Sequence, residues 1–385
     1  MAKKNKVNGF SSFLNNPVDF TLVITVLLLL SIGLVMLLSA SSPTSLQEYD
    51  NSYKYFLRQL VFAVLGLIAM YFISRIDYRI YQKFYKLAWW LSFFSLILVL
   101  VIGTDSHGAK RWIDLGFTTV QPSEFVKFFM IIFYAGILVK NRNDLGKFWK
   151  GLVKHLLFLV PIIGLLILEP HVSTSMVIII TCCVIIIMAG CKFWQFALSG
   201  IVAGGVVGAV ATILYFVNDA FQTRFQYIVT RVITFLDPWQ DVSNTGWQVI
   251  QSLYAIGSGG LFGVGLGDST QKYLYLPEPH NDFIFSVLAE ELGFVGCVFV
   301  FILFAIFIWR GILIAMKAPD MFGSLVAIGI TTLVGIQVII NVAVVTSSMP
   351  ATGMQLPFFS YGGTALFILL CEVGVLLSIS RAGAK

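Results

Sequence analysis

The stretch that decides the fold is "LYLPEPHNDFIFSVLAEELGFVG", residues 274–296, in which a polar, proline-containing segment runs directly into an apolar one. The apolar segment continues to residue 309, so residues 283–309 predict a membrane-spanning helix. The stretch carries four carboxylates, namely Glu278, Asp282, Glu290 and Glu291. The last two lie inside the predicted span, where acids are costly and usually face the interior of a helix bundle. The stretch therefore predicts a membrane protein with polar groups buried between its helices.

The composition agrees with a membrane protein. Of the 385 residues, 58% are hydrophobic and only 11% are charged, which excludes an ordinary soluble domain. The net charge of +6 does not indicate a nucleic-acid partner, because the basic residues fall in short loops between apolar spans. We expect a membrane-embedded chain with no nucleic-acid ligand.

Apolar stretches of about 20 residues, the length that crosses a bilayer, recur along the chain. About ten spans can be drawn, at 20–40, 58–74, 86–103, 122–140, 152–168, 172–190, 193–217, 283–309, 323–347 and 364–380. The sequence therefore predicts an all-α polytopic membrane protein of about ten transmembrane helices. We expect a single transmembrane domain over residues 20–380, with one long extracytoplasmic loop (218–282) between the seventh and eighth helices. Cytoplasmic tails are expected at 1–19 and 381–385.

The basic residues predict the orientation of the chain. With the N-terminus in the cytoplasm, most of the 25 lysines and arginines fall on the cytoplasmic side, as the positive-inside rule requires. Both termini then face the cytoplasm, and the loop 218–282 faces outward together with Asp282.

Polar and glycine-rich segments gather on the outward side. They are "GAKRWIDLGFTTVQPSEFVK" (108–127), "LEPHVST" (168–174), "RVITFLDPWQD" (231–241), "QSLYAIGSGGLFGVGLGDSTQKYLYLPEPHNDFIF" (251–285) and "SSMPATGMQLPFFSYGG" (347–363). Irregular backbone at membrane depth is tolerated only where protein buries it or water reaches it. Their concentration on one side predicts a cavity that opens outward.

Asp282 stands where the outer loop becomes the eighth helix, and two interpretations are open. A carboxylate at the mouth of a cavity can act as a general base on a substrate hydroxyl. An acid at a helix start can equally serve as an N-cap or as a first-turn partner of the helix dipole. Asn caps as well as Asp but cannot accept a proton, so replacement by Asn separates the two interpretations.

Glu290 and Glu291 are adjacent, so their side chains point about 100° apart on a helix and cannot share one role. We expect one of them to face the cavity and the other to bond a neighbouring helix. A structural role for both is the alternative.

The segment "QPSEFVK" (121–127) has the features of a helix start, with Pro122 in the first turn and Glu124 at the positive end of the dipole. Lys127 lies three residues after Glu124 on the same face, which predicts a buried ion pair. The alternative is that Lys127, together with Arg111, attracts a pyrophosphate group.

Other chemistry is poorly supported. The glycine-rich segment 257–267 lacks the Lys-Ser/Thr of a phosphate-binding loop, and "SYGG" (360–363) lacks the context of a nucleophile elbow. The four histidines show no zinc-ligand spacing. His280 lies two residues before Asp282, where it can orient that site or simply be an exposed loop histidine.

Taken together, these motifs resemble the SEDS family (shape, elongation, division and sporulation), which contains FtsW, RodA and SpoVE. The resemblance runs from about residue 17 to the C-terminus. It implies a peptidoglycan glycosyltransferase that polymerises lipid II into glycan strands on the outer face of the bacterial cytoplasmic membrane. It also implies a class B penicillin-binding protein as partner and support by a divalent cation, Mg²⁺ or Mn²⁺, for which the sequence shows no ligand set.

The resemblance assigns roles to individual residues. By similarity Asp282 is the catalytic residue, and Glu124 and Lys127 are an ion pair beside the cavity. We expect the substrates, lipid II and the lipid-linked glycan strand, to be bound by residues of the shared motifs, namely Arg111, Glu124, Lys127, His280, Glu290, Gln355, Ser360 and Tyr361.

The chain departs from the family pattern at "EPHVST" (169–174), where many members carry "QPDLGT". His171 stands in place of that Asp, so no role of the Asp is transferred. The segments "EPH" and "SSMPATG" are closer to the FtsW and SpoVE branches.

The resulting hypothesis is an inverting, processive glycosyltransferase in which Asp282 deprotonates the acceptor hydroxyl of lipid II. One alternative is a lipid II flippase, for which Glu290, Glu291 and Glu372 can supply a polar path through the membrane. The other is a non-catalytic scaffold that positions a class B penicillin-binding protein.

Overall fold

The computed structural model describes residues 16–106, 109–114, 116, 118–169, 172–192, 194–197, 233–241, 245–273 and 275–383. The α-helices are α2 (Phe20–Tyr49), α3 (Lys54–Ile73), α4 (Arg79–Lys83), α5 (Tyr85–Ile102), α6 (Pro122–Lys140), α7 (Lys154–Leu157), α8 (Leu159–Leu168), α9 (Val172–Met188), α12 (Thr245–Ser258), α13 (Ile284–Lys317), α14 (Met321–Val345) and α15 (Gly363–Gly383). The remaining elements are the short helical turns η1 (Arg142–Asp144), η2 (Phe148–Val153) and η3 (Pro238–Asp241) and the strands β1 (Thr104–Ser106), β2 (Ala109–Asp114) and β3 (Thr119–Val120).

The described residues contain eight helical segments that are long and apolar enough to cross a membrane. They are α2, α3, α5, α6, the segment Phe148–Leu168, α13, α14 and α15. The apolar helix α9 is shorter, and it coincides with a further predicted span. The predicted all-α membrane architecture is therefore confirmed. The predicted span 193–217, the tails at 1–15 and 384–385, and parts of the predicted loop 218–282 lie outside the described residues.

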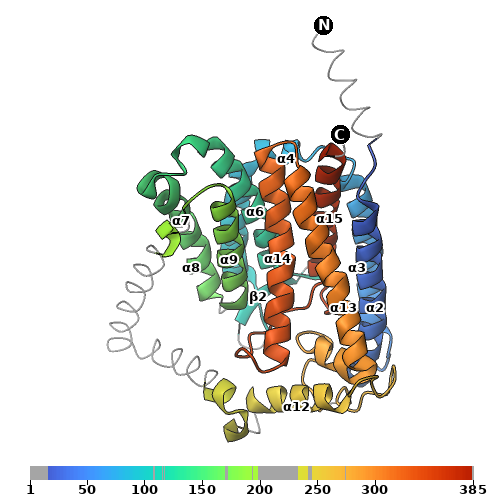
Figure 1. Ribbon diagram of the computed structural model, residues 1–385. Helices are drawn as coiled ribbons and strands as arrows, with labels where there is room; N and C mark the ends of the chain where they lie inside the picture. The colour runs from blue at the N-terminus through green and yellow to red at the C-terminus, as the bar shows by residue number, and fades with distance from the viewer. Residues whose placement is uncertain are drawn as a thin grey trace, which may run out of the picture.

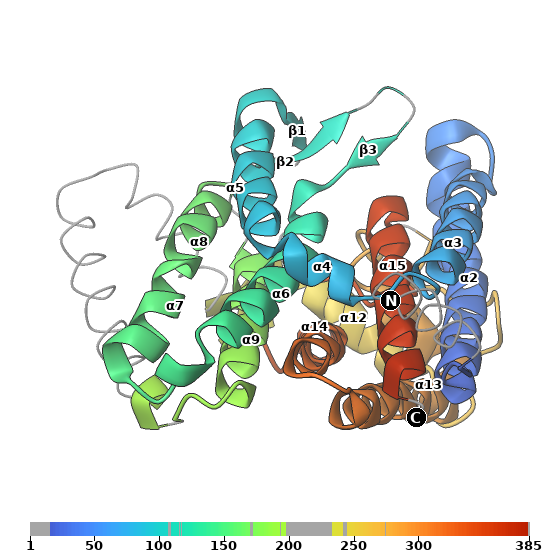
Figure 2. The ribbon, with the colours of Figure 1, turned by 90° about the horizontal axis from the view of Figure 1, so that it is seen from above.

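The long helices run side by side in one bundle, and α12 lies across one end of it (Figure 1). Viewed along the bundle, α14 lies between α9 and α15 (Figure 2), and it packs against α13, α9, α6 and α15. A sheet of three short antiparallel strands, in the order β1-β2-β3, joins α5 to α6. The apolar periodicity of the sequence does not predict this sheet.

The two ends of the described chain meet at one end of the bundle. The side-chain amide of Asn16 donates to the carbonyl of Arg381 (2.9 Å), and the guanidinium of Arg381 donates to the carbonyl of Asn16 (3.3 Å). At this end Arg310, late in α13, binds the carboxylate of Asp19, the N-cap of α2 (Nε to Oδ2, 2.9 Å). Helices α13 and α2 are therefore antiparallel, and α13 begins at the end of the bundle opposite the termini.

The helix α13 is broken inside the bundle. Gly293 has φ 67° and ψ −169°, which interrupts the helix roughly 14 Å from its start. The glycine-rich segment 257–267 fills the break, because its backbone takes over the hydrogen bonds that the helix loses. The four bonds are Val264 N to Glu290 O (3.0 Å), Gly265 N to Glu291 O (3.2 Å), Phe294 N to Gly260 O (3.0 Å) and Val295 N to Leu261 O (3.1 Å). Broken helices persist in membranes when neighbouring backbone re-satisfies the freed groups in this way.

This backbone-to-backbone contact requires glycine on both sides. A Cβ on Gly293 would lie 2.2 Å from the amide nitrogen of Gly263, and a Cβ on Gly263 would lie 2.1 Å from the carbonyl oxygen of Glu291. Both residues also have positive φ, which disfavours any other residue. Gly259 and Gly263 of segment 257–267 therefore serve close packing against α13.

We expect Gly293→Ala to destabilise the protein by about 3 kcal/mol or more, because it adds a backbone clash to an unfavourable φ. Chemical unfolding of the detergent-purified protein measures the loss. Gly335→Ala in α14 is the matched control, since its Cβ would come no closer than 3.4 Å to Ile308. Equal stability of the two variants would contradict the packing argument.

Candidate active site

Asp282 lies immediately before α13, at the end of the bundle opposite the chain termini, and its side chain is half-buried. The N-cap position of α13 is occupied by Phe283 and makes no side-chain capping bond. Asp282 is thus outside the helix, and the N-cap interpretation of this residue is wrong. The acid occupies a loop position from which it can reach a ligand at the bundle end.

The segment that contains Asp282 is joined to the loop that precedes α15. The amide of Tyr361 donates to the carbonyl of His280 (2.8 Å), and the hydroxyl of Ser360 donates to the carbonyl of Asn281 (2.6 Å). The side-chain amide of Asn341 donates to the carbonyls of Asp282 (2.9 Å) and Met354 (2.6 Å). The motifs "PEPHND" and "TGMQLPFFSYGG", far apart in sequence, therefore form one structural unit.

A third element fixes the same unit. Gln59 of α3 is buried, and its side-chain amide donates to the carbonyl of Ser360 (3.2 Å) while its side-chain oxygen accepts from the amide of Gly362 (3.1 Å). The loop before α15 is consequently held from α3, from α14 and from the segment 280–282.

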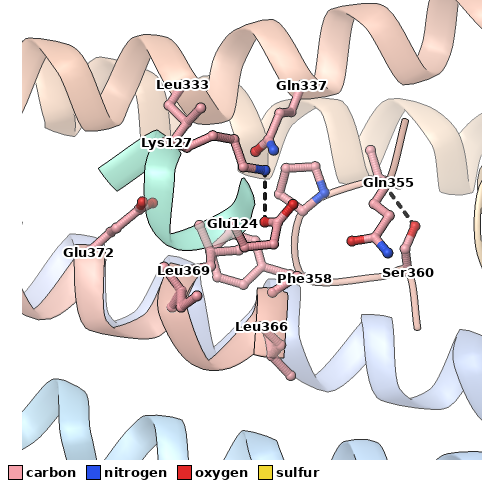
Figure 3. A pocket seen from close by; sticks show the side chains of 14 residues that line it. Glu124, Lys127, Leu333, Gln337, Gln355, Phe358, Ser360, Leu366, Leu369 and Glu372 are labelled. Carbon is pink, nitrogen blue, oxygen red and sulfur yellow. Dashed lines mark hydrogen bonds and ion pairs between the residues drawn. The ribbon is translucent and has the colours of Figure 1, made fainter. Parts of the chain in front are cut away.

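A small cavity lies beneath this loop, between α6, α14 and α15 (Figure 3). Its wall combines polar and apolar side chains. The polar ones are Glu124, Lys127, Gln337, Gln355, Ser360 and Glu372, and the apolar ones are Leu333, Leu356, Pro357, Phe358, Ala365, Leu366, Ile368 and Leu369. Polar side chains from three apolar helices and from the loop before α15 therefore line one cavity.

The predicted ion pair is present in the wall of this cavity. Lys127 Nζ lies 2.7 Å from Glu124 Oε2, with side chains 5% and 12% exposed, and Pro122 starts the helix as predicted. Glu372 of α15 faces the same cavity and is buried (Figure 3). Glu124 already pairs with Lys127, and Glu372 adds a second carboxyl group to the same wall. An anion placed at Lys127 would therefore compete with carboxylates.

Arg111 is not among the residues that line this cavity. It lies on β2 and is half-buried, and its Nε donates to the carbonyl of Glu169 (3.3 Å). Burial raises the pKa of the Glu169 carboxyl to about 8, and Arg111 opposes that rise. The structure therefore places Arg111 beside Glu169, and it does not bring Arg111 and Lys127 into one described cavity.

Glu290 and Glu291 bind residues 269–272, which directly follow the segment that fills the break in α13. The Glu290 carboxylate accepts hydrogen bonds from Ser269 Oγ and from the amide and hydroxyl of Thr270 (both 2.9 Å). Glu291 pairs with Lys272 (2.8 Å) and accepts from Ser39 of α2 (2.6 Å). Both acids are 1% exposed. Glu291 thus bonds a neighbouring helix as predicted, whereas Glu290 faces the loop and not the cavity beside Glu124.

His280 is 4% exposed, so its interpretation as an exposed loop histidine is wrong. Its ring lies 4.7 Å from that of Tyr55 and 5.9 Å from that of Tyr361, measured between centroids. Burial lowers the pKa of His280, with Glu278 and Glu48 opposing the shift. A neutral, packed His280 supports the loop that carries Asp282.

Residues that the sequence analysis did not single out also belong to the site. Gln337 lines the cavity, and Asn341 bridges the two loops. The two lie four residues apart on α14 and thus share one face of a helix that is otherwise largely apolar. Two polar side chains four residues apart in an apolar span are a sequence signal from which both residues could have been predicted.

Comparison with known proteins agrees with this arrangement. Residues 20–385 match the family model described as cell cycle protein, FtsW/RodA/SpoVE. The chain belongs to this family. It is 44% identical to stage V sporulation protein E of Bacillus subtilis, over 94% of this chain and 97% of the relative. It is 38% identical to the probable peptidoglycan glycosyltransferase FtsW of Coxiella burnetii, over 94% and 96% of the two chains.

The fold of this FtsW/RodA/SpoVE family member also matches a solved structure. A chain of a peptidoglycan synthase complex, studied for its structural coordination of polymerization and crosslinking, superposes with a TM-score of 0.77. The two chains are 29% identical, and the match covers 95% of this chain and 98% of the other. The SEDS family predicted from the sequence motifs is thereby confirmed.

The described residues offer no protein cage for a metal ion. They contain no group of three or more His, Cys, Asp and Glu side chains that could hold one. His171, at the position where the sequence departs from the family pattern, lies outside the described residues.

We expect Lys127→Met to destabilise the protein by about 3 kcal/mol, because it leaves the largely buried Glu124 carboxylate without a counter-ion. The double variant Glu124→Gln, Lys127→Met should recover most of that loss. Chemical unfolding in detergent measures both. Lys147→Met is the control, because the Lys147–Asp144 pair has the same spacing but is exposed, so solvent screens it and its loss should change stability little. An equal loss in Lys127→Met and Lys147→Met would refute the buried-pair argument.

Proposed function

We propose that this protein is a peptidoglycan glycosyltransferase that polymerises lipid II, with Asp282 as the general base. The observation that carries the proposal is the position of Asp282. Its half-buried carboxylate lies on a loop at one end of a membrane bundle, and that loop is bonded to the wall of a polar cavity. The names of the FtsW relatives and of the synthase complex support the same activity.

The orientation that suits this activity has both termini in the cytoplasm and Asp282 on the outer face of a bacterial cytoplasmic membrane. The basic groups Arg75, Arg79, Lys83 and Arg381 support it, because they lie in or near elements at the terminus end of the bundle. A substrate that is assembled inside the cell and consumed outside would meet the acid on that face.

Asp282 would remove the proton from the acceptor hydroxyl as the hydroxyl oxygen attacks the anomeric carbon of the lipid-linked strand. The bond from that carbon to the pyrophosphate oxygen breaks, and polyprenyl pyrophosphate leaves. A positioned base typically contributes about 10²–10⁴-fold to a rate. Lys127 and Arg111 are candidates to stabilise the leaving charge. Lys127 can do so only if its bond to Glu124 is exchanged.

The remaining site residues have supporting roles in this proposal. Gln355 and Ser360 reach the cavity from the loop before α15, and Tyr361 and His280 pack where that loop meets the Asp282 segment. Glu290 acts through the loop that it holds. A divalent cation, Mg²⁺ or Mn²⁺, stays a prediction of the family resemblance, and no step above depends on it.

We further propose a class B penicillin-binding protein as the partner that cross-links the strands. The similarity to a chain of a complex that couples polymerization and crosslinking supports this partner. The partner matters for any test, because the glycosyltransferase should be assayed in the complex in which it works.

Strand synthesis in detergent separates the proposal from its alternatives. A flippase gives no product there, because no bilayer exists to flip lipid II across. A scaffold gives product only through another enzyme, so its outer-face point variants keep function as long as the partner binds. The enzyme proposed here makes glycan strands itself.

We expect Asp282→Asn to lose at least about 100-fold of lipid II polymerisation while the protein remains folded. The fold should persist because Asn341 binds the backbone carbonyl of residue 282 and not its side chain. The assay follows strand length with the purified complex, and the melting temperature reports the fold. Asp268→Asn is the control, an exposed acid in the same outer segment. A fully active Asp282→Asn protein would exclude Asp282 as the base.

A further inference from the structure

A glycine lies beside the Asp282 carboxylate. Gly353, in the loop before α15, is exposed and has φ 67°. A Cβ at this position would lie 3.1 Å from Asp282 Oδ2 and 3.9 Å from its Cγ. Among the described residues, and apart from the chain neighbours of Gly353, no other atom comes within 4 Å of that Cβ position. An added methyl group would therefore press on the Asp282 carboxylate.

The backbone carbonyl of Asp282 accepts a hydrogen bond from the buried side chain of Asn341. Asn341 is 0% exposed, and its amide nitrogen donates to the carbonyls of Asp282 (2.9 Å) and Met354 (2.6 Å). Its side-chain oxygen has no hydrogen-bond partner among the described residues. The two hydrogen bonds donated by the Asn341 side chain therefore tie residue 282 to residue 354.

These two contacts act on the same acid from different sides. Asn341 sets the distance between the Asp282 segment and the loop 353–361, and Gly353, one residue before Met354, leaves the space in which the carboxylate lies. We propose that Asn341 and Gly353 are positioning residues that together fix where the Asp282 carboxylate points. The inference rests on the proposed function, since it takes Asp282 as the base.

Positioning residues matter because the rate depends strongly on the distance between a general base and the proton that it removes. A base must lie within about 3 Å of the proton that it removes. A displacement of about 1 Å can cost on the order of 100-fold in rate. Asp282 lies in a loop outside α13 and has no helix to hold its backbone, so its position depends on contacts such as those from Asn341.

Gly353→Ala tests the space beside the carboxylate. We expect kcat for strand synthesis to fall, by less than the roughly 100-fold that a displacement of about 1 Å costs, because a Cβ 3.1 Å from Oδ2 makes the carboxylate move only slightly. KM should change by less than about threefold, because the substrate still binds. Gly260→Ala is the matched control. Gly260 also has positive φ (53°), but its added Cβ would meet nothing within 4 Å. The melting temperatures of the two variants should fall by similar amounts, since both substitutions introduce the same kind of backbone strain.

Asn341→Leu tests the bridge. It keeps a similar size but removes both donated hydrogen bonds, so we expect the same fall in kcat with little change in KM. Thr331→Val is its control, a buried hydroxyl on the same helix that donates only to the carbonyl of Ala327. If Asn341→Leu does not fold, Gly353→Ala still decides the question.

The outcomes separate this inference from the proposed function. If Asp282→Asn is inactive and Gly353→Ala stays within about threefold of Gly260→Ala, the positioning role is refuted while the base remains. If Gly353→Ala raises KM instead of lowering kcat, Gly353 shapes substrate binding and the inference is wrong. If Asp282→Asn is active, the proposed function fails, and the inference fails with it.

Discussion

The structure depends on a transmembrane helix that is broken and then completed by another part of the chain. At Gly293 the helix α13 loses its own hydrogen bonds, and the backbone of segment 257–267 supplies them. In a bilayer an unsatisfied backbone group costs several kcal/mol, so this replacement is a condition for the helix to exist at all. The buried Lys272–Glu291 pair and the Glu290 bonds hold the inserted segment in place.

This arrangement explains why acids lie inside a greasy helix. The burial of Glu290 and Glu291 is explained without a bound substrate, because each acid has protein partners at hydrogen-bond distance. Fixing the segment 257–272 also fixes the chain that follows it toward Asp282. The positions of the loops at the bundle end therefore depend on the contacts made at the break in α13.

The chemistry at that end is distributed over two neighbouring regions. Asp282 belongs to a half-buried loop, while Glu124, Lys127 and Glu372 line a cavity between α6, α14 and α15. The loop before α15 belongs to both regions, since Ser360 faces the cavity and bonds Asn281. A change on one side of this loop can thus reach the other. In the proposed function, this loop would couple the cavity to Asp282.

The sequence by itself determined the membrane class, most span positions, the Glu124–Lys127 pair and the acid at residue 282. These follow from local rules, namely the length of apolar runs, helix-start chemistry and side-chain spacing within one helix. The tertiary structure alone decided the break in α13, the burial of His280, the loop contact of Glu290 and the bridge made by Asn341. Each of these joins segments tens to hundreds of residues apart, and such contacts depend on how helices pack, which no single window of sequence contains.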